Sequence, residues 1–593
     1  MSEPHGNARQ WRGGRPASGL FGLLISAVLL TGCQLGPTAS PAVATTALTE
    51  PTSGVTPTVA AAHPPTQTTA RPAATTAPST PASPVTPALP TAPTTPATTV
   101  TPRGAATPTA ATVGAVCAFT PPLAGGRGIP AATPGATPPV SGTPGRVAAP
   151  AQVPPTIPLP DLAARYTMTI DGVDFDAGRL HTTQTVAITN GEACALDRLS
   201  FSVVAARWGW FTLDSVRVAG QPVAATVTGT VLPVPLARPL TPGATVEVTL
   251  DFRLTVGTAN DSYTGSGFAG TTRANDILRF AYWFPILSDD HQYPPYLDPP
   301  YTATASYDVT MTTPANLVVA PTGEITGETA NADGTVTRRI AADNVRDFVF
   351  ALSPNYQVAR RQSATGTQIE VYYSPNSFRG SAANPQTIQF LVDKALTAAT
   401  LAEEQLSALI GPYPYPTLRV VDGGAALSGG IEFPNLVMVN LSFGSDNLIY
   451  HEVAHEWLYG LIGTRTQQDP WIDEGGASFL AAYIEGRLSA NPPGPAQFRY
   501  PLDTSVWAIP ASGNRNAATE AIYTQGEAFY TRVFDAMGAE PFWRAMQALY
   551  AADRYGIITP RDILTAWQAA SPTDLRPLFH EYFSYPWIDE LTQ

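Results

Sequence analysis

Between residues 161 and 360, apolar and polar residues alternate in short runs separated by glycine and proline. The segment YTMTIDGVDFDAGRLHTTQTVAITN (166–190) is rich in threonine, valine and isoleucine, and ASYDVTMTTPANLVVAPTG (305–323) and RDFVFALS (346–353) continue the pattern. Alternation with turn residues at this spacing is typical of short, half-buried strands. We therefore expect a β-sandwich-like domain over residues 161–360.

The pattern changes after residue 360. The segment NPQTIQFLVDKALTAATLAEEQLSALIG (384–411) repeats its apolar residues at helical spacing and stops at a glycine, which predicts a long helix. TLRVVD (417–422) predicts a strand, and helical segments follow through most of the remainder. Together these patterns predict an α+β multidomain protein whose second domain, 361–593, is mostly helical.

The first 33 residues have the organisation of an export signal. Arginines precede the apolar run GLFGLLISAVLLTG (19–32), which is too short for a comfortable membrane span. The run ends in LTGC (30–33), which resembles the lipobox of bacterial lipoproteins, in which the cysteine is lipidated. We expect Cys33 to anchor the protein to the membrane at the bacterial cell envelope, on the extracellular face or in the periplasm. The alternative is a secretory signal with a chance cysteine.

Residues 34–160 are dominated by proline, threonine and alanine, so we expect a disordered stalk without a core. Only 13% of the 593 residues are charged, the formal net charge is −13, and no long cluster of lysine or arginine occurs. We therefore expect no nucleic-acid partner. An exported compartment permits a disulfide between Cys117 and Cys194, and two unpaired thiols are the alternative.

The segment HEVAHEW (451–457) places two histidines four residues apart. On a helix, His451 and His455 would lie on one face and reach one metal ion, and Glu452 would be placed to take a proton from a water that the metal activates. The alternative is a chance pattern on a solvated helix. The chain has seven histidines, and the flanking NLIY and WLYGLIG are strongly apolar. A buried helix could not leave these polar groups without partners, which favours a zinc site.

A third ligand is available downstream. The segment DPWIDEGGASFLAAYIEGRL (469–488) predicts a second helix with Glu474 in its first turn. Eighteen residues separate His455 from Glu474, enough for a turn that returns the carboxylate to the metal. We expect one Zn²⁺ per chain.

HEVAHEW, whose second histidine is followed after eighteen residues by a glutamate within WIDEGGASF, resembles the gluzincin metallopeptidases of the aminopeptidase N and leukotriene hydrolase family. The resemblance covers roughly 161–593. It implies a β-rich, saddle-like N-terminal domain and a thermolysin-like catalytic domain. It also implies that His451, His455 and Glu474 bind zinc and that Glu452 is the general base.

Upstream, SGGIEFPNLVMVN (428–440) resembles the exopeptidase segment of that family. The resemblance implies that Gly429, Gly430 and Glu432 contribute to substrate binding, with Glu432 gripping the free α-amine. The sequence NLVMVN (435–440) predicts an edge strand that could pair with a bound peptide backbone.

Downstream, AIYTQGEAFY (521–530) resembles the family's tyrosine element, which implies that Tyr523 donates a hydrogen bond to the developing oxyanion. Three positions depart from the family pattern: Ile431 replaces methionine, Phe433 replaces asparagine, and Gln525 replaces lysine. We also expect a short form of the family that lacks its C-terminal helical domain, which would leave a more open cleft.

The leading hypothesis is a zinc peptidase, most simply an aminopeptidase that acts on peptides. An endopeptidase or a peptidase with a narrow substrate range is the alternative within enzymes. A catalytically vestigial surface-binding protein is the alternative outside them.

Overall fold

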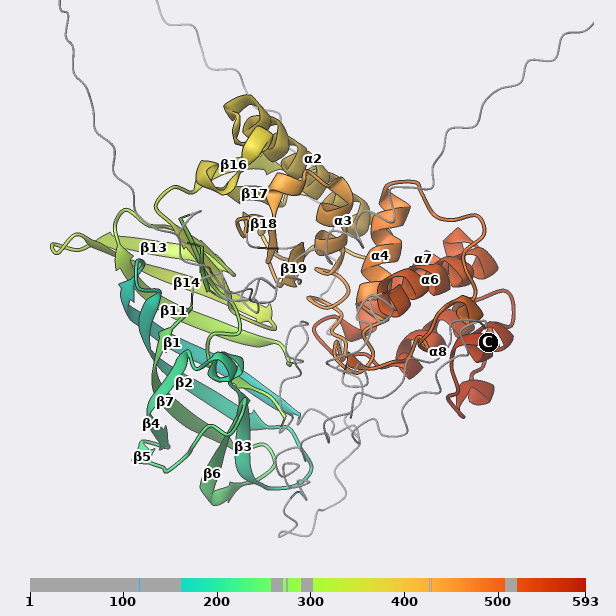
Figure 1. Ribbon diagram of the computed structural model, residues 1–593. Helices are drawn as coiled ribbons and strands as arrows, with labels where there is room; N and C mark the ends of the chain where they lie inside the picture. Colours follow the sequence, from blue (N-terminus) through green and yellow to red (C-terminus); the bar gives the residue numbers. More distant parts are fainter. Residues whose placement is uncertain are drawn as a thin grey trace, which may run out of the picture. The chain divides into compact units, whose positions relative to one another are not determined.

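The computed structural model describes Cys117 and residues 161–257, 270–272, 276–289, 302–425, 427, 429–506 and 520–593. All of these residues belong to one of the two units into which the chain divides. The predicted signal peptide with Cys33 lies outside the described residues, as does the predicted stalk apart from Cys117. Figure 1 shows that the described chain combines β-sheets and helices, which confirms the mixed fold class.

The largest described sheet has eight strands in the order β13-β14-β11-β1-β2-β7-β4-β5. Their bounds are β1 Leu162–Asp174, β2 Arg179–Asn190, β4 Phe211–Val218, β5 Gln221–Pro222, β7 Thr245–Thr255, β11 Ala305–Pro314, β13 Glu324–Ala330 and β14 Thr335–Val345. Alternate residues of β2 are buried, as the sequence alternation predicts. Only β1 and β11 pair in parallel, and the other neighbours in this sheet are antiparallel.

Two smaller sheets complete the β-rich part. One has the order β10-β3-β6 and the other β12-β15-β9-β8. Their bounds are β3 Leu196–Ser202, β6 Val231–Leu240, β8 Gly270–Thr272, β9 Ile277–Phe280, β10 Ile286–Leu287, β12 Val318–Pro321 and β15 Phe350–Ser353. The core that these sheets share includes Trp283, which is fully buried and donates its indole N–H to the Phe348 carbonyl at 2.8 Å.

A five-stranded sheet packs against helices α2 (Pro385–Leu409) and α3 (Asp446–Ala454). Its order is β16-β17-β18-β20-β19, with bounds β16 Gln357–Gln362, β17 Gln368–Tyr373, β18 Thr417–Asp422, β19 Gly430–Phe433 and β20 Leu436–Val439. The expectation that 435–440 forms the edge strand is wrong. β20 lies inside the sheet, because it pairs in parallel with β18 and antiparallel with β19. The strand at that edge of the sheet is β19, which contains Glu432, and β16 forms the opposite edge.

The described helices pack around this sheet and one another. Their bounds are α2 Pro385–Leu409, α3 Asp446–Ala454, α4 Glu474–Ile484, α6 Gln525–Met537, α7 Ala539–Asp553, α8 Pro560–Ala570 and α9 Arg576–Tyr582. The Asn384 side chain caps α2 by accepting from the Gln386 N–H at 2.9 Å. In the part of the chain that the structure describes, no helix is both long and apolar enough to cross a bilayer.

Hydrogen bonds join the β-rich part to the five-stranded sheet and the helices. The Arg346 guanidinium is buried and donates to the carbonyls of Thr302 (2.9 Å), Tyr459 (2.7 Å) and Gly556. The Gly323 N–H donates to the Asn435 side-chain oxygen at 2.8 Å. An apolar cluster that includes residues of β9, β15, β18, β19 and β20 fills the junction and is called the junction cluster below.

Cys117 and Cys194 form a disulfide. The Cys117 N–H also donates to the Ala195 carbonyl at 2.8 Å. Residue 117 is thereby attached, covalently and by hydrogen bonding, at the beginning of β3.

Candidate active site

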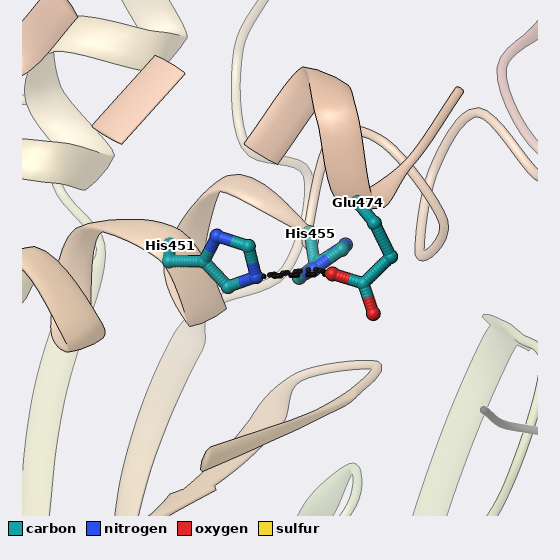
Figure 2. A group of neighbouring side chains, drawn as sticks. All are labelled: His451, His455 and Glu474. Atoms are coloured by element: carbon teal, nitrogen blue, oxygen red, sulfur yellow. Dashed lines mark hydrogen bonds and ion pairs between the residues drawn. The ribbon is translucent and has the colours of Figure 1, made fainter. Parts of the chain in front are cut away.

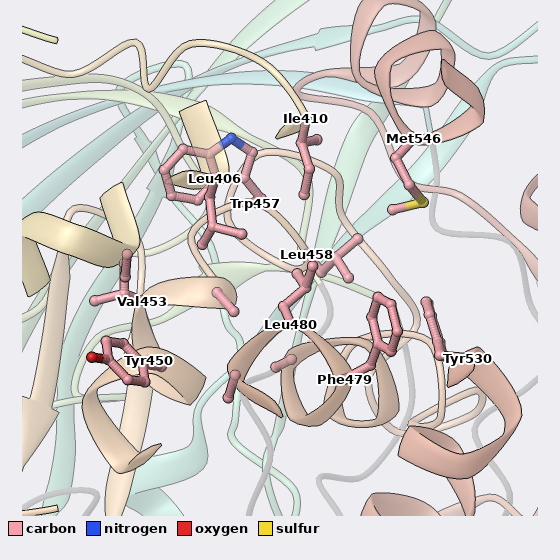
Figure 3. Close-up of a cluster of buried hydrophobic side chains, with 14 of the residues drawn as sticks. Leu406, Ile410, Tyr450, Val453, Trp457, Leu458, Phe479, Leu480, Tyr530 and Met546 are labelled. Atoms are coloured by element: carbon pink, nitrogen blue, oxygen red, sulfur yellow. The ribbon is translucent and has the colours of Figure 1, made fainter. Parts of the chain in front are cut away.

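Helix α3 presents the two histidines of HEVAHEW. The Ser445 side chain caps the helix by accepting from the Leu448 N–H at 3.1 Å. His451 lies in the last turn and His455 is the C-cap residue, so both rings point to the same side (Figure 2). On the other side of this segment, Tyr450 and Val453 pack in the buried core of the helical part (Figure 3).

Helix α4 begins at Glu474. The Asp473 carboxylate caps this helix by accepting from the Glu474 N–H at 2.9 Å, and Thr464 donates to the other oxygen of Asp473. The first turn of a helix carries a partial positive charge, which favours an ionised carboxylate at that position. The Glu474 side chain is 7% exposed.

Three donor atoms converge between these helices. Nε2 of His451 lies 3.1 Å from Oε2 of Glu474 and 3.2 Å from Nε2 of His455, and the third separation, from His455 Nε2 to Glu474 Oε2, is 3.3 Å. Within the described residues, this is the one group of three or more potential ligands close enough to share a metal ion. The structure therefore brings together the three predicted ligands.

The separations fit a tetrahedral zinc ion. Ligand atoms at about 2.0–2.1 Å from such an ion lie about 3.3–3.4 Å from one another. Nδ1 of His455 lies 3.1 Å from the Leu458 carbonyl, which can only accept, so Nδ1 carries a proton and Nε2 is the ring nitrogen left to bind a metal. Two imidazole nitrogens and a carboxylate oxygen are ligands that zinc prefers.

The charges around the site also favour a cation. Burial lowers the pKa of His451, which keeps the ring in its neutral, ligating form. Burial alone would raise the pKa of Glu474, but hydrogen bonds from His451 and His455 outweigh it and lower that pKa. Burial also opposes protonation of His455, yet the charges of Glu432, Glu474 and Glu452 raise its pKa well above the usual value. A bound metal ion would likewise offset the negative charge of these three glutamates.

Glu452 lies beside the triangle, against the edge strand. Its side chain is buried, and burial raises the pKa of its carboxyl to about 8. A Cβ atom at Gly430 would overlap the Glu452 carboxylate. Glycine at position 430 thus leaves the space that the Glu452 carboxylate occupies.

Tyr523 contacts two of the three predicted ligands, Glu474 and His451. It belongs to a π-helical turn, Glu520–Thr524, that leads directly into α6. Its hydroxyl donates to Oε1 of Glu474 at 2.6 Å, and its ring stacks on His451 with 5.8 Å between ring centroids. π-helical turns of this kind occur frequently at functional sites.

The two faces of β19 have different roles. Gly430 and Glu432 lie on the face that meets α3, as the contact of Gly430 with Glu452 and the influence of Glu432 on the pKa of His455 indicate. Ile431 and Phe433 point the other way, into the junction cluster. The Gly429 carbonyl accepts a hydrogen bond from the Asn440 N–H at 3.0 Å.

This alternation explains two departures from the family pattern. Phe433 is 1% exposed, and its ring packs edge-on against Tyr282 with centroids 5.5 Å apart. Ile431 is 4% exposed in the same cluster. Both side chains stabilise the junction rather than face the site. Gln525 is fully buried, and neither atom of its amide has a hydrogen-bond partner within the described structure.

Sequence reasoning missed a contact between two glycines that sets the distance between α4 and α6. A Cβ atom at Gly475 would lie 2.7 Å from Cα of Gly526, so neither position has room for a side chain. This close approach lets Tyr523 reach Glu474. The signal was present as GG after Glu474 and as QG after Tyr523, but the pairing of the two is not visible from the sequence.

Sequence reasoning also missed the support behind His455. Tyr459 has a φ of 123°, which is unusual for a residue other than glycine, and Arg346 donates to its carbonyl. The adjacent Leu458 carbonyl orients His455. Glu456 is buried and accepts from the Asn435 N–H at 2.9 Å, which fixes the helix end to the sheet.

The described chain has the fold of two-domain zinc metallopeptidases, as comparison with solved structures shows. An M1 zinc metallopeptidase from Deinococcus radiodurans aligns with a TM-score of 0.51 and 16% identity, over 69% of this chain and 90% of its own. A variant of the Deinococcus radiodurans enzyme bound to a Tyr-Ser-Ala substrate aligns with a TM-score of 0.52 and 17% identity, over 73% and 96%. A two-domain M1 variant bound to L-arginine gives 0.53 and 17%, over 69% and 91%.

No protein-family model and no curated protein matches the sequence. At 16–17% identity the structural likeness concerns the fold. The predicted resemblance to the gluzincin metallopeptidases is confirmed at that level.

The glycine contact generates a first prediction. Replacing Gly526 with alanine would force α4 and α6 apart, because the new Cβ would meet the backbone of Gly475 rather than a movable side chain. We expect the free energy of unfolding to fall by about 1–3 kcal/mol, as is usual for overpacking. Denaturant unfolding monitored by tryptophan fluorescence measures the change.

The control is Gly494→Ala, because a Cβ at Gly494 meets nothing within 4 Å and its φ of −82° suits alanine. That variant should differ from the wild type by about 0.5 kcal/mol or less. Equal stability of both variants would contradict the close packing of the two helices.

Proposed function

We propose that this protein is a zinc-dependent peptidase with one Zn²⁺ per chain, held by His451, His455 and Glu474. The observation that carries the proposal is the triangle of donor atoms, 3.1–3.3 Å on each side, with Glu452 and Tyr523 beside it. The shared fold of M1 zinc metallopeptidases, one of which was solved with a Tyr-Ser-Ala substrate, supports the choice of reaction.

Bound zinc would supply a Lewis acid that polarises the scissile carbonyl and makes water acidic enough to attack at neutral pH. Glu452 would take the proton of the attacking water on its carboxylate and then give it to the leaving amine. A carboxyl group with a pKa raised to about 8 by burial holds a proton more firmly than an exposed glutamate. This property suits a group that must accept a proton and later release it.

Tyr523 would stabilise the negative charge that develops on the carbonyl oxygen. Its hydroxyl is held at the site by the bond to Glu474 and by stacking on His451. A donor fixed in advance costs little reorganisation when the charge develops, and such a group contributes a few kcal/mol. The hydroxyl would exchange its contact with Glu474 for one with the substrate oxygen.

We further propose that the peptidase is an aminopeptidase. Glu432 is buried on the edge strand β19, on the face that meets α3. A buried carboxylate at this position would favour the protonated amino terminus of a peptide. An edge strand also offers free backbone groups with which an extended substrate can pair.

Export and membrane anchoring through Cys33 are also proposed, together with a short form of the family fold. The support for export is the sequence of residues 1–33 and the Cys117–Cys194 disulfide, a bond that persists in oxidising compartments. The two-domain M1 structures support the short form.

The test of the mechanism is Glu452→Gln in the full chain. We expect hydrolysis of aminoacyl amides to fall by about 10²–10⁴-fold, because the general base is lost, while the zinc content stays near one per chain. Glu540→Gln is the matched control, since the Glu540 side chain is 86% exposed on α7. If the Glu452→Gln variant hydrolyses substrate at the wild-type rate, the assigned role is wrong. The role is also wrong if the variant loses activity because it no longer binds zinc.

Gly430→Ala tests the placement of Glu452 without changing a chemical group. The added methyl would displace the Glu452 side chain, which supplies its three nearest atoms. We expect kcat to fall at least 10-fold with zinc retained, because displacement of a reacting group by a fraction of an ångström is costly. Gly494→Ala is again the control, and unchanged kcat in Gly430→Ala would refute the placement.

Peptides with free and acetylated amino termini test the aminopeptidase assignment. The wild type should prefer the free amine, and Glu432→Gln should lower kcat/KM for free-amine peptides about 30-fold or more, since the ammonium group would lose its charged partner. The same substitution should leave the slow cleavage of acetylated peptides unchanged. Indifference of the wild type to acetylation would favour an endopeptidase.

A further inference from the structure

The Arg279 side chain is fully buried, and no hydrogen-bond partner is found for it in the described structure. It lies on β9, its exposed fraction is 0%, and none of its three side-chain nitrogens makes a hydrogen bond in the structure as described. Burial lowers the pKa of Arg279 to about 10, so the guanidinium is still positive at neutral pH. An unsatisfied buried charge is costly enough that a partner is required.

The three other buried arginines of the described residues have acceptors, and Arg338 donates to Glu328 at 2.6 Å and to Thr313 at 2.8 Å. Arg346 donates to three backbone carbonyls. Arg419 donates to the Gly323 carbonyl at 2.7 Å and approaches the carboxylates of Glu324 and Glu370. Arg279 is the exception among the four buried arginines, so its lack of acceptors is not a general property of the fold.

Apolar residues surround much of the Arg279 side chain, although Asp422 and Tyr356 lie close enough to interact with its charge. Ile277 lies two residues before Arg279 on the same face of β9, and Ile277 and Ala281 both belong to the junction cluster. Leu427 and Ile431 lie in the same cluster. A Cβ atom at Gly423 would lie 3.4 Å from Nη1 of Arg279, so the guanidinium sits beside the turn that leads into β19.

Asp422, the acid that interacts with Arg279 electrostatically, does not supply the acceptor. One of its carboxylate oxygens accepts from the Ser377 hydroxyl, and the other accepts from the Gly424 N–H at 3.0 Å. The Tyr356 hydroxyl is also engaged, because it donates to the Asp422 carbonyl at 2.8 Å. The donors of Arg279 therefore need an acceptor that is not part of these side chains.

We propose that Arg279 binds a small monovalent anion, of which chloride is the representative, between β9 and the turn that begins at Gly423. Complete burial selects a small ligand with a single charge, because desolvation of a divalent oxyanion would cost far more. A peptide carboxylate is excluded by the burial. The bound anion would attach this turn, and thereby the start of β19, to the β-rich part of the chain.

The anion site does not depend on the proposed peptidase activity, so stability is the primary readout. The full chain is dialysed into sodium gluconate, and chloride is then added at constant ionic strength while Tm is recorded. We expect a saturable rise of a few degrees, since a ligand that binds the native state alone stabilises it. An equal ionic strength of sulfate should produce no such rise. A Tm that is indifferent to the identity of the anion would overturn the proposal and would indicate bound water.

Variants assign the effect to Arg279. Arg279→Met should abolish the chloride-dependent rise, and Arg253→Met is the matched control, because the Arg253 side chain is 61% exposed on the same β-rich part. Arg279→Lys retains the charge and should weaken the response without removing it. An unchanged response in Arg279→Met would refute the site.

Crystals of the wild type soaked in bromide provide a measurement that does not require a folded variant. An anomalous peak within hydrogen-bond distance of the Arg279 guanidinium is the expected result. A guanidinium surrounded by water, with bromide elsewhere, would overturn the proposal.

Discussion

Three ligand atoms that converge on one place are the constraint on which the rest of this structure depends. The Nε2 atoms of His451 and His455 and a carboxylate oxygen of Glu474 meet within 3.3 Å of one another, in a buried region. A shared proton or a bound cation is needed to offset the repulsion among these atoms. The capped start of α3, the capped start of α4 and the Leu458 carbonyl all hold these atoms together, and they define the geometry of a metal centre.

The edge strand β19 connects this centre to the β-rich part of the chain. One face of the strand carries Glu432 and makes room for Glu452, while the other face buries Ile431 and Phe433 in the junction. A shift of the β-rich part would therefore move the strand that borders the site. The Arg346 guanidinium adds a second connection, through the backbone beside His455. The β-rich part is consequently a component of the site's geometry.

Local patterns in the sequence account for much of this arrangement. The periodicity of 384–411 predicts a helix, and α2 spans Pro385–Leu409; TLRVVD predicts a strand, and β18 spans Thr417–Asp422. The placement of the two histidines on one side follows from helical geometry, whereas the eighteen-residue spacing allows the return of Glu474 without determining it. The features that the sequence does not predict are contacts between residues far apart in the chain. Which of β19 and β20 lies at the edge depends on the pairing with β18, and the contact of Gly475 with Gly526 depends on how two helices pack.

The disulfide has a mechanical consequence. Cys117 is bonded to Cys194 at the beginning of β3, so tension applied to the chain before residue 117 would pass directly into the β-rich part. While the bond is oxidised, this tension would pass from Cys117 to Cys194 through the disulfide. The force would therefore act first on Cys194, which is distant in sequence from HEVAHEW. After reduction of the disulfide, the same force would act first on the beginning of β1.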